Sequence, residues 1–332
     1  MRWSEPGPLV ALAVGAVLLS ALGTAWAGRH ARRRGLLDAP GMRRSHALPT
    51  ARGGGIGIVA VGLGTFGLLS LDNARAAGLA GIGLLLVAAV GWWDDHRPLP
   101  AWPRLLAHVV AGLCLGLAAA AWGAPSGLAV VAGLLVPVLV NIWNFIDGID
   151  GLAASQALLW MLALAWLATG PARVLAVAIS AGCAGFLPFN FPRARIFLGD
   201  VGSGALGYLL AAGAALAMIG LPREQLPLLL LPATACWVDA SLTLGWRMVR
   251  GERWWQPHVQ HLYQQLARRV GHVPVTLAYA GWTLGAIAIM LAMGQSGGPA
   301  IGSGALAFAA ASVAMWHYLQ NRIMCRHQGI GR

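Results

Sequence analysis

The chemistry of this sequence centres on its acidic residues, because only eleven are present and more than half of them fall in four short segments. Those six are Asp94, Asp95, Asp147, Asp150, Asp200 and Asp239. Asp94 and Asp95 are adjacent, and adjacent side chains do not face the same way on a helix. One carboxylate can therefore reach into a site while the other pairs or caps, which suits Mg²⁺ binding or proton abstraction. A solvated helix end with ion pairs to Arg97 is the alternative.

A second polar segment reads Asn-Ile-Trp-Asn-Phe-Ile-Asp-Gly-Ile-Asp-Gly, in which Asn141, Asn144, Asp147 and Asp150 recur every three residues. If the segment is helical or tightly wound, these side chains lie close together. The glycines let a ligand approach the backbone, and amide and carboxylate oxygens favour Mg²⁺ and sugar or nucleoside hydroxyls. A polar helix end with capping side chains is the alternative.

A third segment, Phe-Leu-Gly-Asp-Val-Gly-Ser-Gly, places Asp200 and Ser203 between glycines where a helix is expected to begin. Helix starts attract anions, and an acid there can hold a metal ion. Arg193 and Arg195 just before it could hold phosphate, or they could be ordinary residues of a cytoplasmic loop.

Two further loops carry candidate binding residues. His258 and His261 are three residues apart; no nearby Cys or third His completes a zinc site, so phosphate contact is the better hypothesis, against incidental histidines on a surface helix. The first loop ends in a Pro-Thr-Ala-Arg-Gly-Gly-Gly run that contains Arg52. Its glycines would let backbone amides approach a ligand.

These loops must be positioned by membrane-spanning helices. The chain has 332 residues, is 58% hydrophobic and 10% charged, and has a mean hydropathy of +0.68. About 20 apolar residues cross a bilayer as a helix. The sequence therefore predicts an all-α polytopic membrane protein, one domain over residues 1–332, with 10 or 11 spans. The expected spans are 7–27, 53–71, 77–93, 104–122, 126–143, 152–169, 173–190, 203–219, 226–246, 275–293 and 300–318.

All 23 basic residues are arginine, and their distribution predicts the orientation. One alternating set of loops and the C-terminal tail hold 19 of them, and the other connections hold four. Arginine collects on the cytoplasmic side, so the candidate loops should face the cytoplasm and the N-terminus the periplasm. The formal charge of +12 follows from these loops rather than from a soluble basic domain, so we expect no nucleic-acid partner.

In order along the chain come a Pro-Thr-x-x-Gly-Gly loop, the aspartate pair, Asn-Phe-x-Asp-Gly-x-Asp-Gly, Phe-Leu-Gly-Asp-x-Gly-Ser and a histidine loop. Together, over residues 43–265, they resemble the polyprenyl-phosphate N-acetylhexosamine-1-phosphate transferase family, of glycosyltransferase family 4 type. The resemblance implies transfer of a sugar-1-phosphate from a UDP-sugar to undecaprenyl phosphate, with release of UMP. It also implies Mg²⁺, for which Mn²⁺ may substitute, and a multi-pass protein of the bacterial inner membrane.

The same resemblance implies roles for individual residues. Asp94 resembles the base that acts on the acceptor phosphate, with Asp95 beside it, and Asp147 and Asp150 resemble catalytic residues that organise the metal and the donor. The implied metal ligands are Asp200 and Asn144. The implied substrate-binding residues are Asn141, Asn144, Arg195, His258, His261 and Arg52. Direct attack by the lipid phosphate and a phospho-aspartate intermediate both stay open.

The histidine loop reads His-Val-Gln-His-Leu-Tyr-Gln, whereas the peptidoglycan branch of the family carries three histidines followed by Phe-Glu. The loop is closer to members that initiate O-antigen or other cell-surface glycans. The alternatives are the phospho-MurNAc-pentapeptide transferase of peptidoglycan synthesis and, in another class, a membrane transporter whose acids relay ions. The many small residues could also serve a homodimer.

Overall fold

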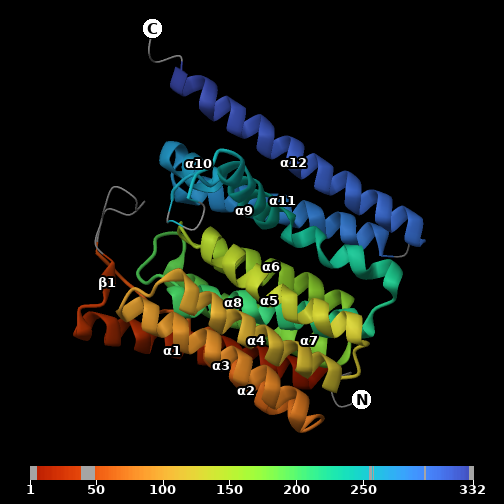
Figure 1. Ribbon diagram of the computed structural model, residues 1–332. Coiled ribbons are helices and arrows are strands. Elements are labelled where there is room, and N and C mark those ends of the chain that lie inside the picture. The colour runs from red at the N-terminus through yellow and green to blue at the C-terminus, as the bar shows by residue number, and fades with distance from the viewer. Residues whose placement is uncertain (1–5, 39–48, 254–255, 257, 295–296, 329–332) are drawn as a thin grey trace.

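The computed structural model describes residues 6–38, 49–253, 256, 258–294 and 297–328, and within them the chain is almost entirely helical (Figure 1). Two short strands and two 3₁₀ segments accompany twelve α-helices in this described part. In chain order the elements are α1 (Pro6–Arg34), β1 (Leu37–Asp38), β2 (Thr50–Ala51), α2 (Ile56–Leu69), α3 (Ala74–His96), α4 (Ala101–Ala121), α5 (Ser126–Ile146), α6 (Leu152–Leu167), α7 (Gly170–Asn190), α8 (Asp200–Gly220), η1 (Arg223–Leu229), η2 (Leu231–Ala233), α9 (Thr234–Val249), α10 (Leu262–Val270), α11 (His272–Met293) and α12 (Gly298–Gln328).

Each of the eleven predicted spans coincides with helix, and the prediction of an all-α polytopic membrane protein is confirmed. Nine helical segments of the described chain are long and apolar enough to cross a membrane. The other two, α2 and α6, are apolar but only 14 and 16 residues long. The sequence predicted one regular helix over 226–246; instead the segment begins as the 3₁₀ turns η1 and η2, because prolines at 227 and 232 cannot donate α-helical hydrogen bonds.

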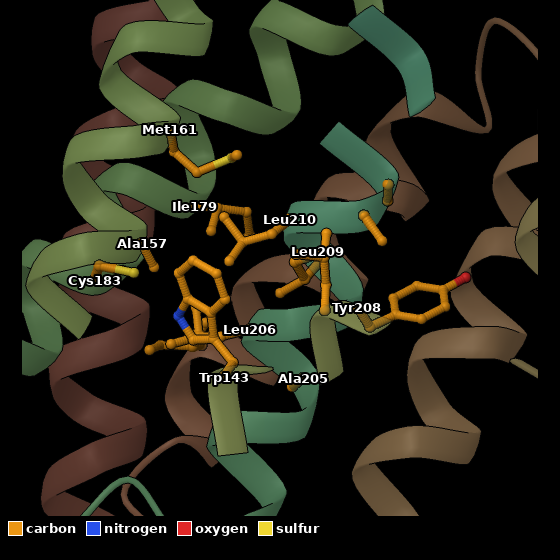
Figure 2. Close-up of a cluster of buried hydrophobic side chains, with 14 of the residues drawn as sticks. Trp143, Ala157, Met161, Ile179, Cys183, Ala205, Leu206, Tyr208, Leu209 and Leu210 are labelled. Carbon is orange, nitrogen blue, oxygen red and sulfur yellow. The ribbon is translucent and has the colours of Figure 1, made fainter. Parts of the chain in front are cut away.

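Helix α8 is the centre of the bundle. It packs against α5 and α3 most extensively and also touches α2, α4, α6 and α7, so nearly all of its side chains are buried. Its sequence is dominated by Ala, Gly and Leu, and such small residues let membrane helices approach closely. Figure 2 shows Leu206 and Leu210 of α8 packed beside Trp143 of α5 and Ile179 of α7.

A second group of helices, α9 to α12, lies beside this bundle, with the long helix α12 outermost (Figure 1). Helix α10 and strand β1 lie at the same end of the molecule, close to the C-terminal ends of α3 and α5 and the start of α8. This end therefore collects the loops in which the sequence placed its polar motifs.

The Pro-Thr-x-x-Gly-Gly loop is held by backbone pairing with the segment that precedes α8. Ala51 forms a parallel bridge with Ile196, and the amides of Gly54 and Gly55 donate to the carbonyls of Phe197 and Leu198 at 2.9 Å each. A Cβ on Gly55 would lie only 2.1 Å from the Cα of Gly202. These glycines bring two backbones together, so the expectation that their amides face a ligand is wrong for Gly54 and Gly55.

Helix α3 crosses the start of α8 at Gly91, where a Cβ would lie 2.4 Å from the carbonyl oxygen of Asp200. The nearest atoms all belong to the backbone of α8, so no flexible side chain could move aside for a larger residue at position 91. One turn later α3 carries its two aspartates. The close crossing therefore fixes how far those acids stand from the N-terminus of α8.

We predict that Gly91→Ala separates α3 from α8 and lowers thermal stability in detergent, by about 1–3 kcal/mol as is usual for overpacking. Gly78→Ala is the matched control in the same helix, because a Cβ there meets nothing within 4 Å. Thermal unfolding of both variants checks this. Equal melting temperatures for the two would contradict the crossing.

Candidate active site

Four acids predicted from the sequence meet where α3, α5 and α8 converge. Asp94 lies at the end of α3 and accepts hydrogen bonds from the amide of Leu99 at 2.5 Å and from Nη1 of Arg104 at 2.8 Å. Its carboxyl group lies near that of Asp200, the first residue of α8, because Nη1 of Arg104 is within 4 Å of both. Asp94 is thus placed beside Asp200 but is already engaged on both oxygens.

Asp95 caps helix α8 from a neighbouring helix. Its Oδ1 accepts the amide of Asp200 at 3.0 Å and its Oδ2 accepts the amide of Val201 at 3.1 Å. Helix starts leave such amides without partners, and a carboxylate there also interacts favourably with the helix dipole. Gly199 has φ +77°, and a Cβ on it would lie 2.6 Å from Oδ2 of Asp95, so the motif requires glycine at this position. Asp95 therefore holds Asp200 in place.

Asn144, near the end of α5, fixes the other side of Asp200. Its Nδ2 donates to Oδ1 of Asp200 at 2.7 Å and to Oγ of Ser203 at 3.3 Å. In this geometry the amide nitrogen, rather than the amide oxygen, faces the carboxylate. Asn144 therefore orients Asp200 by hydrogen bonding.

Arg104 is a site residue that we did not single out from the sequence. It lies in the first turn of α4, and its Nη1 is 2.8 Å from Asp94 and 3.9 Å from Oδ2 of Asp200. The signal was present: α3 and α4 are joined by only four residues, and a short connection between antiparallel helices brings the end of one beside the start of the next. Arg104 places a positive charge beside the two carboxylates.

Asp147 differs from the other acids because no hydrogen bond or ion pair engages its carboxylate among the described residues. It lies directly after α5 and lines two cavities, one polar and one mainly apolar. Burial, and the nearby Asp95 carboxylate, raise the pKa of Asp147 to about 7, although Arg52 opposes the shift. A carboxylate with this pKa can exchange a proton at neutral pH.

Two cavities meet at these acids. A polar cavity of about 260 Å³ is lined by Arg52 and Asp95 on one side and by Gln264 and Arg268 of α10 on the other. A larger groove of about 840 Å³ runs between α3, α4, α5 and α9 and is mainly apolar. The two share Asp147, Gly148, Asp200 and Gln264 in their walls. A ligand in each would therefore meet the other at the acids.

His258 and His261 line the same groove as Asp147 and Asp200. Their rings are 4.7 Å apart, and the ring of Phe145 lies 5.6 Å from that of His261. Burial lowers the pKa of His258 to about 4, helped by the nearby His261 and Arg247, and burial also lowers the pKa of His261. Both imidazoles are therefore neutral at pH 7 and would contact a phosphate through N–H groups rather than through charge.

The acids of this region could hold a metal ion only with help from other ligands. Among the residues that the structure describes, no group of three or more His, Cys, Asp or Glu side chains is placed to hold a metal ion. Mg²⁺, however, is commonly bound through one or two carboxylates and completes its shell with water and substrate phosphates. The neighbouring carboxyl groups of Asp94 and Asp200, both within 4 Å of Nη1 of Arg104, fit that pattern.

Comparisons with known proteins identify relatives of this sequence. Residues 78–219 match the model of glycosyl transferase family 4. A decaprenyl-phosphate N-acetylglucosaminephosphotransferase of Mycobacterium tuberculosis (strain ATCC 25618 / H37Rv) is 29% identical over 73% of this chain and 71% of its own length. One of Mycolicibacterium smegmatis is 31% identical over 59% of this chain and 57% of its own. A phospho-N-acetylmuramoyl-pentapeptide-transferase of Heliobacterium modesticaldum is 28% identical over 76% of this chain and 84% of its own.

The chain is thus similar to polyprenyl-phosphate hexosamine-1-phosphate transferases, over residues 78–219 by the family model and over about three quarters of its length by these relatives. It is accordingly an enzyme that transfers a sugar-1-phosphate, and the alternative of a transporter is set aside. The matched segment, 78–219, includes the aspartate pair, the Asn-Phe-x-Asp-Gly-x-Asp-Gly segment and the start of α8.

Some residues predicted for the transferase site lie elsewhere. Asp150, predicted to be catalytic, lines neither cavity: its carboxylate accepts the amide of Ala194 at 3.2 Å and lies 3.2 Å from Nδ1 of His272. The expected three-residue repeat fails because α5 ends at Ile146, and the chain then turns through Gly151 at φ +77°. Asp150 therefore ties the turn to α11.

Three predicted substrate-binding residues are engaged with the protein itself. Arg195 lies outside both cavities, where it donates to the carbonyl of Pro188 at 2.7 Å and stacks on Phe189. Asn141 lines the groove but donates to the carbonyl of Pro137 in its own helix, also at 2.7 Å. Arg52 lines the polar cavity and forms a 2.6 Å ion pair with Asp38. The structure thus removes Arg195 from the site and leaves the other two on its walls.

We predict that Asp147→Asn stabilises the protein at alkaline pH. The folded pKa of about 7 lies above the ordinary 3.8, so the carboxyl's contribution to stability is full below pH 3.8 and is lost as pH rises through 7. At pH 8, with a chelator present, the free energy of unfolding of the variant should exceed that of wild type by about 1–2 kcal/mol. This is less than the full pKa shift implies, because the carboxyl group is partly exposed. Thermal unfolding between pH 5 and pH 8 measures the gain, which should shrink toward pH 5.

The control for that comparison is Asp72→Asn, which removes one exposed carboxylate at the opposite end of α3. A gain that is equal for both variants would reflect total charge. No gain in stability for Asp147→Asn at pH 8 would show that the Asp147 carboxylate is not destabilised by its surroundings.

Proposed function

We propose that the protein transfers an N-acetylhexosamine-1-phosphate from a UDP-sugar to undecaprenyl phosphate, releasing UMP and forming the polyprenyl-diphospho-sugar. The observation that carries the proposal is the meeting of two unlike cavities at Asp147 and Asp200. One is small and polar, as a nucleotide requires, and the other is long and apolar, as a lipid chain requires.

The nucleotide belongs in the polar cavity. Arg52 and Arg268 contribute positive charge to its walls, and Asn190 and Gln264 contribute amides. Guanidinium groups bind diphosphates well because their planar donors match phosphate oxygens. The sugar-bearing phosphate then lies toward the acids that the two cavities share.

The acceptor lipid belongs in the groove, because its walls are formed by membrane-spanning helices. Apolar side chains cover most of it, and they include Val87, Val90, Leu105, Val138 and Leu244. Arg104 lies at the end of the groove beside Asp94 and Asp200. The phosphate of a lipid whose chain follows the groove would thus meet a guanidinium group at the reacting centre.

The cofactor proposed for the site is Mg²⁺, which Mn²⁺ would replace, held by Asp200 with Asp94 as the second carboxylate. Asn144 then acts by orienting Asp200 rather than as a ligand through its oxygen. The ion would neutralise the charge of the donor phosphates and so lower the barrier to attack by another anion.

In the reaction, an oxygen of the acceptor phosphate attacks the sugar-bearing phosphorus of the donor. The new P–O bond forms as the P–O bond to UMP breaks, and UMP leaves with the bridging oxygen. Asp147, unpaired and with a pKa near 7, takes the proton of an acceptor phosphate that arrives protonated. We assign this proton transfer to Asp147 rather than to Asp94, because Asp94 is ion-paired with Arg104 and is assigned to the metal, and both make it a weaker base.

The donor sugar proposed first is N-acetylglucosamine or a related N-acetylhexosamine. Two of the relatives described above are named for N-acetylglucosamine and one for the muramoyl pentapeptide. The two-histidine loop that lines the groove favours the smaller donor, since it departs from the three-histidine cluster of the peptidoglycan branch. The product would initiate O-antigen or another cell-surface glycan at the bacterial inner membrane.

We predict that purified protein with Mg²⁺, undecaprenyl phosphate and a panel of UDP-sugars releases UMP with one or a few donors. Asp200→Asn should lower the rate at least 100-fold while the protein stays folded, because an amide is a poor ligand for Mg²⁺. Asp72→Asn, distant from the site, should retain the wild-type rate. No UMP release with any donor would sink the transferase proposal, and full turnover by Asp200→Asn would sink the metal assignment.

The topology makes a separate prediction, that the two ends of α3 face opposite compartments. In a cysteine-free background, Arg97→Cys beside the aspartates should react with a membrane-impermeant thiol reagent only in inverted vesicles. Leu71→Cys, exposed at the other end of α3, should react only in right-side-out vesicles. Labelling of both from one side would contradict the proposed orientation.

A further inference from the structure

Helix α9 presents three polar residues on one buried face. Asp239, Thr243 and Arg247 follow at intervals of four residues, and all three are less than 10% exposed. Asp239 and Arg247 line neither of the two site cavities. Since a buried acid within a membrane-spanning helix is costly, Asp239 needs an explanation that substrate contact does not provide.

Asp239 is surrounded by hydrogen-bond donors from three other helices. Its Oδ1 accepts the amide of Leu262 at 2.8 Å and Nε1 of Trp316 at 3.2 Å. Its Oδ2 accepts the amide of Tyr263 at 3.1 Å and the hydroxyl of Tyr279 at 2.8 Å. The two amides are the first of α10, so Asp239 caps that helix from within the bundle.

Arg247, two turns further along α9, holds the beginning of the segment that leads to α10. Its Nη1 pairs with Glu252 at 2.8 Å, and its Nη2 donates to the carbonyl of Arg253 at 3.1 Å. Gln260, near the end of the segment, donates to the same Glu252 carboxylate at 3.1 Å. One face of α9 thus holds both ends of the histidine-bearing segment.

The start of α10 is also docked on the site itself. The hydroxyl of Tyr263 donates to the carbonyl of Phe145 at 2.8 Å, and a Cβ on Gly148 would lie 2.2 Å from that hydroxyl oxygen. Gly148 directly follows Asp147. Any shift of α10 relative to α9 would therefore move the histidines relative to the turn that carries the free acid.

We propose that Asp239 and Arg247 are positioning residues, which hold the described residues on either side of the histidines, 252–253 and 260–263, so that His258 and His261 face the groove. Asp239 acts through the amides of α10, and Arg247 acts through Glu252. The inference rests on the proposed function in taking the sugar-bearing phosphate of the donor, which would lie where the two cavities meet, as the ligand of the histidines on the groove wall.

The principal test is Asp239→Asn, which keeps the shape of the side chain but offers one acceptor oxygen where two are used. Amide hydrogen exchange at residues 262–266 should rise at least tenfold, because the cap is lost. The KM for the UDP-sugar should rise at least fivefold, whereas the KM for undecaprenyl phosphate should stay within twofold. In a His258→Ala background the same substitution should change the donor KM less than twofold.

Thr283→Val is the matched control, since it removes a buried 2.6 Å hydrogen bond from α11 to Gln156 of α6 without touching α10. It should lower the melting temperature and leave both KM values and the 262–266 exchange unchanged. Tyr279→Phe removes one donor to Asp239 and keeps the test open if Asp239→Asn does not fold. Its donor KM should rise about twofold, in the same direction.

The outcomes separate the two proposals. The positioning role is overturned if Asp239→Asn and Tyr279→Phe, like Thr283→Val, leave both KM values and the exchange at residues 262–266 unchanged. If Asp239→Asn increases the exchange at residues 262–266 but the wild-type protein releases no UMP, the capping role of Asp239 stands and the proposed function is rejected. Equal increases in both KM values would overturn the assignment of the segment to the donor.

Discussion

The arrangement of the site depends on the contact between Asp95 and the first two amides of α8. A helix leaves its first N–H groups without partners, and within a membrane-spanning bundle little water is available to satisfy them. A carboxylate from α3 satisfies them, and its charge is favoured by the helix dipole. Because α8 is central and nearly all of its side chains are buried, this contact positions Asp200 against every helix that packs on α8.

The same physical arrangement occurs twice, and it divides the acids by role. Asp95 caps α8 from α3, and Asp239 caps α10 from α9, each with its two oxygens on two consecutive amides. Both oxygens of each carboxylate are therefore bonded to the protein itself. Asp150 likewise ties a turn to α11. The clustered acids therefore do indicate a site, but three of the six, Asp95, Asp150 and Asp239, contribute to it by holding other elements in place.

The sequence predicted the helices well because hydrophobic length is a direct consequence of bilayer thickness. It also predicted that Asp94, Asp200 and His258 lie at one end, since alternating connections of a helical bundle lie on the same side. It could not predict which acids are engaged. The three-residue spacing placed Asp150 beside Asp147, but spacing has meaning only while the helix continues, and α5 ends between them. Arg104 was missed because it belongs to no motif: only the short connection between α3 and α4 brings it beside Asp94.

The balance of charge at the convergence of α3, α5 and α8 explains why such a site would need a divalent ion. Asp94, Asp95, Asp147 and Asp200 gather there, and Arg52 and Arg104 are the cations that act on them. Arg52 is itself paired with Asp38. A donor diphosphate and an acceptor phosphate would add further negative charge to a cavity already short of positive charge, where repulsion is poorly screened. Burial raises the pKa of Asp147 to about 7, and the Asp95 carboxylate adds to the shift, so without a further cation the group is only partly ionised at neutral pH. A bound Mg²⁺ would favour its ionised, proton-accepting form.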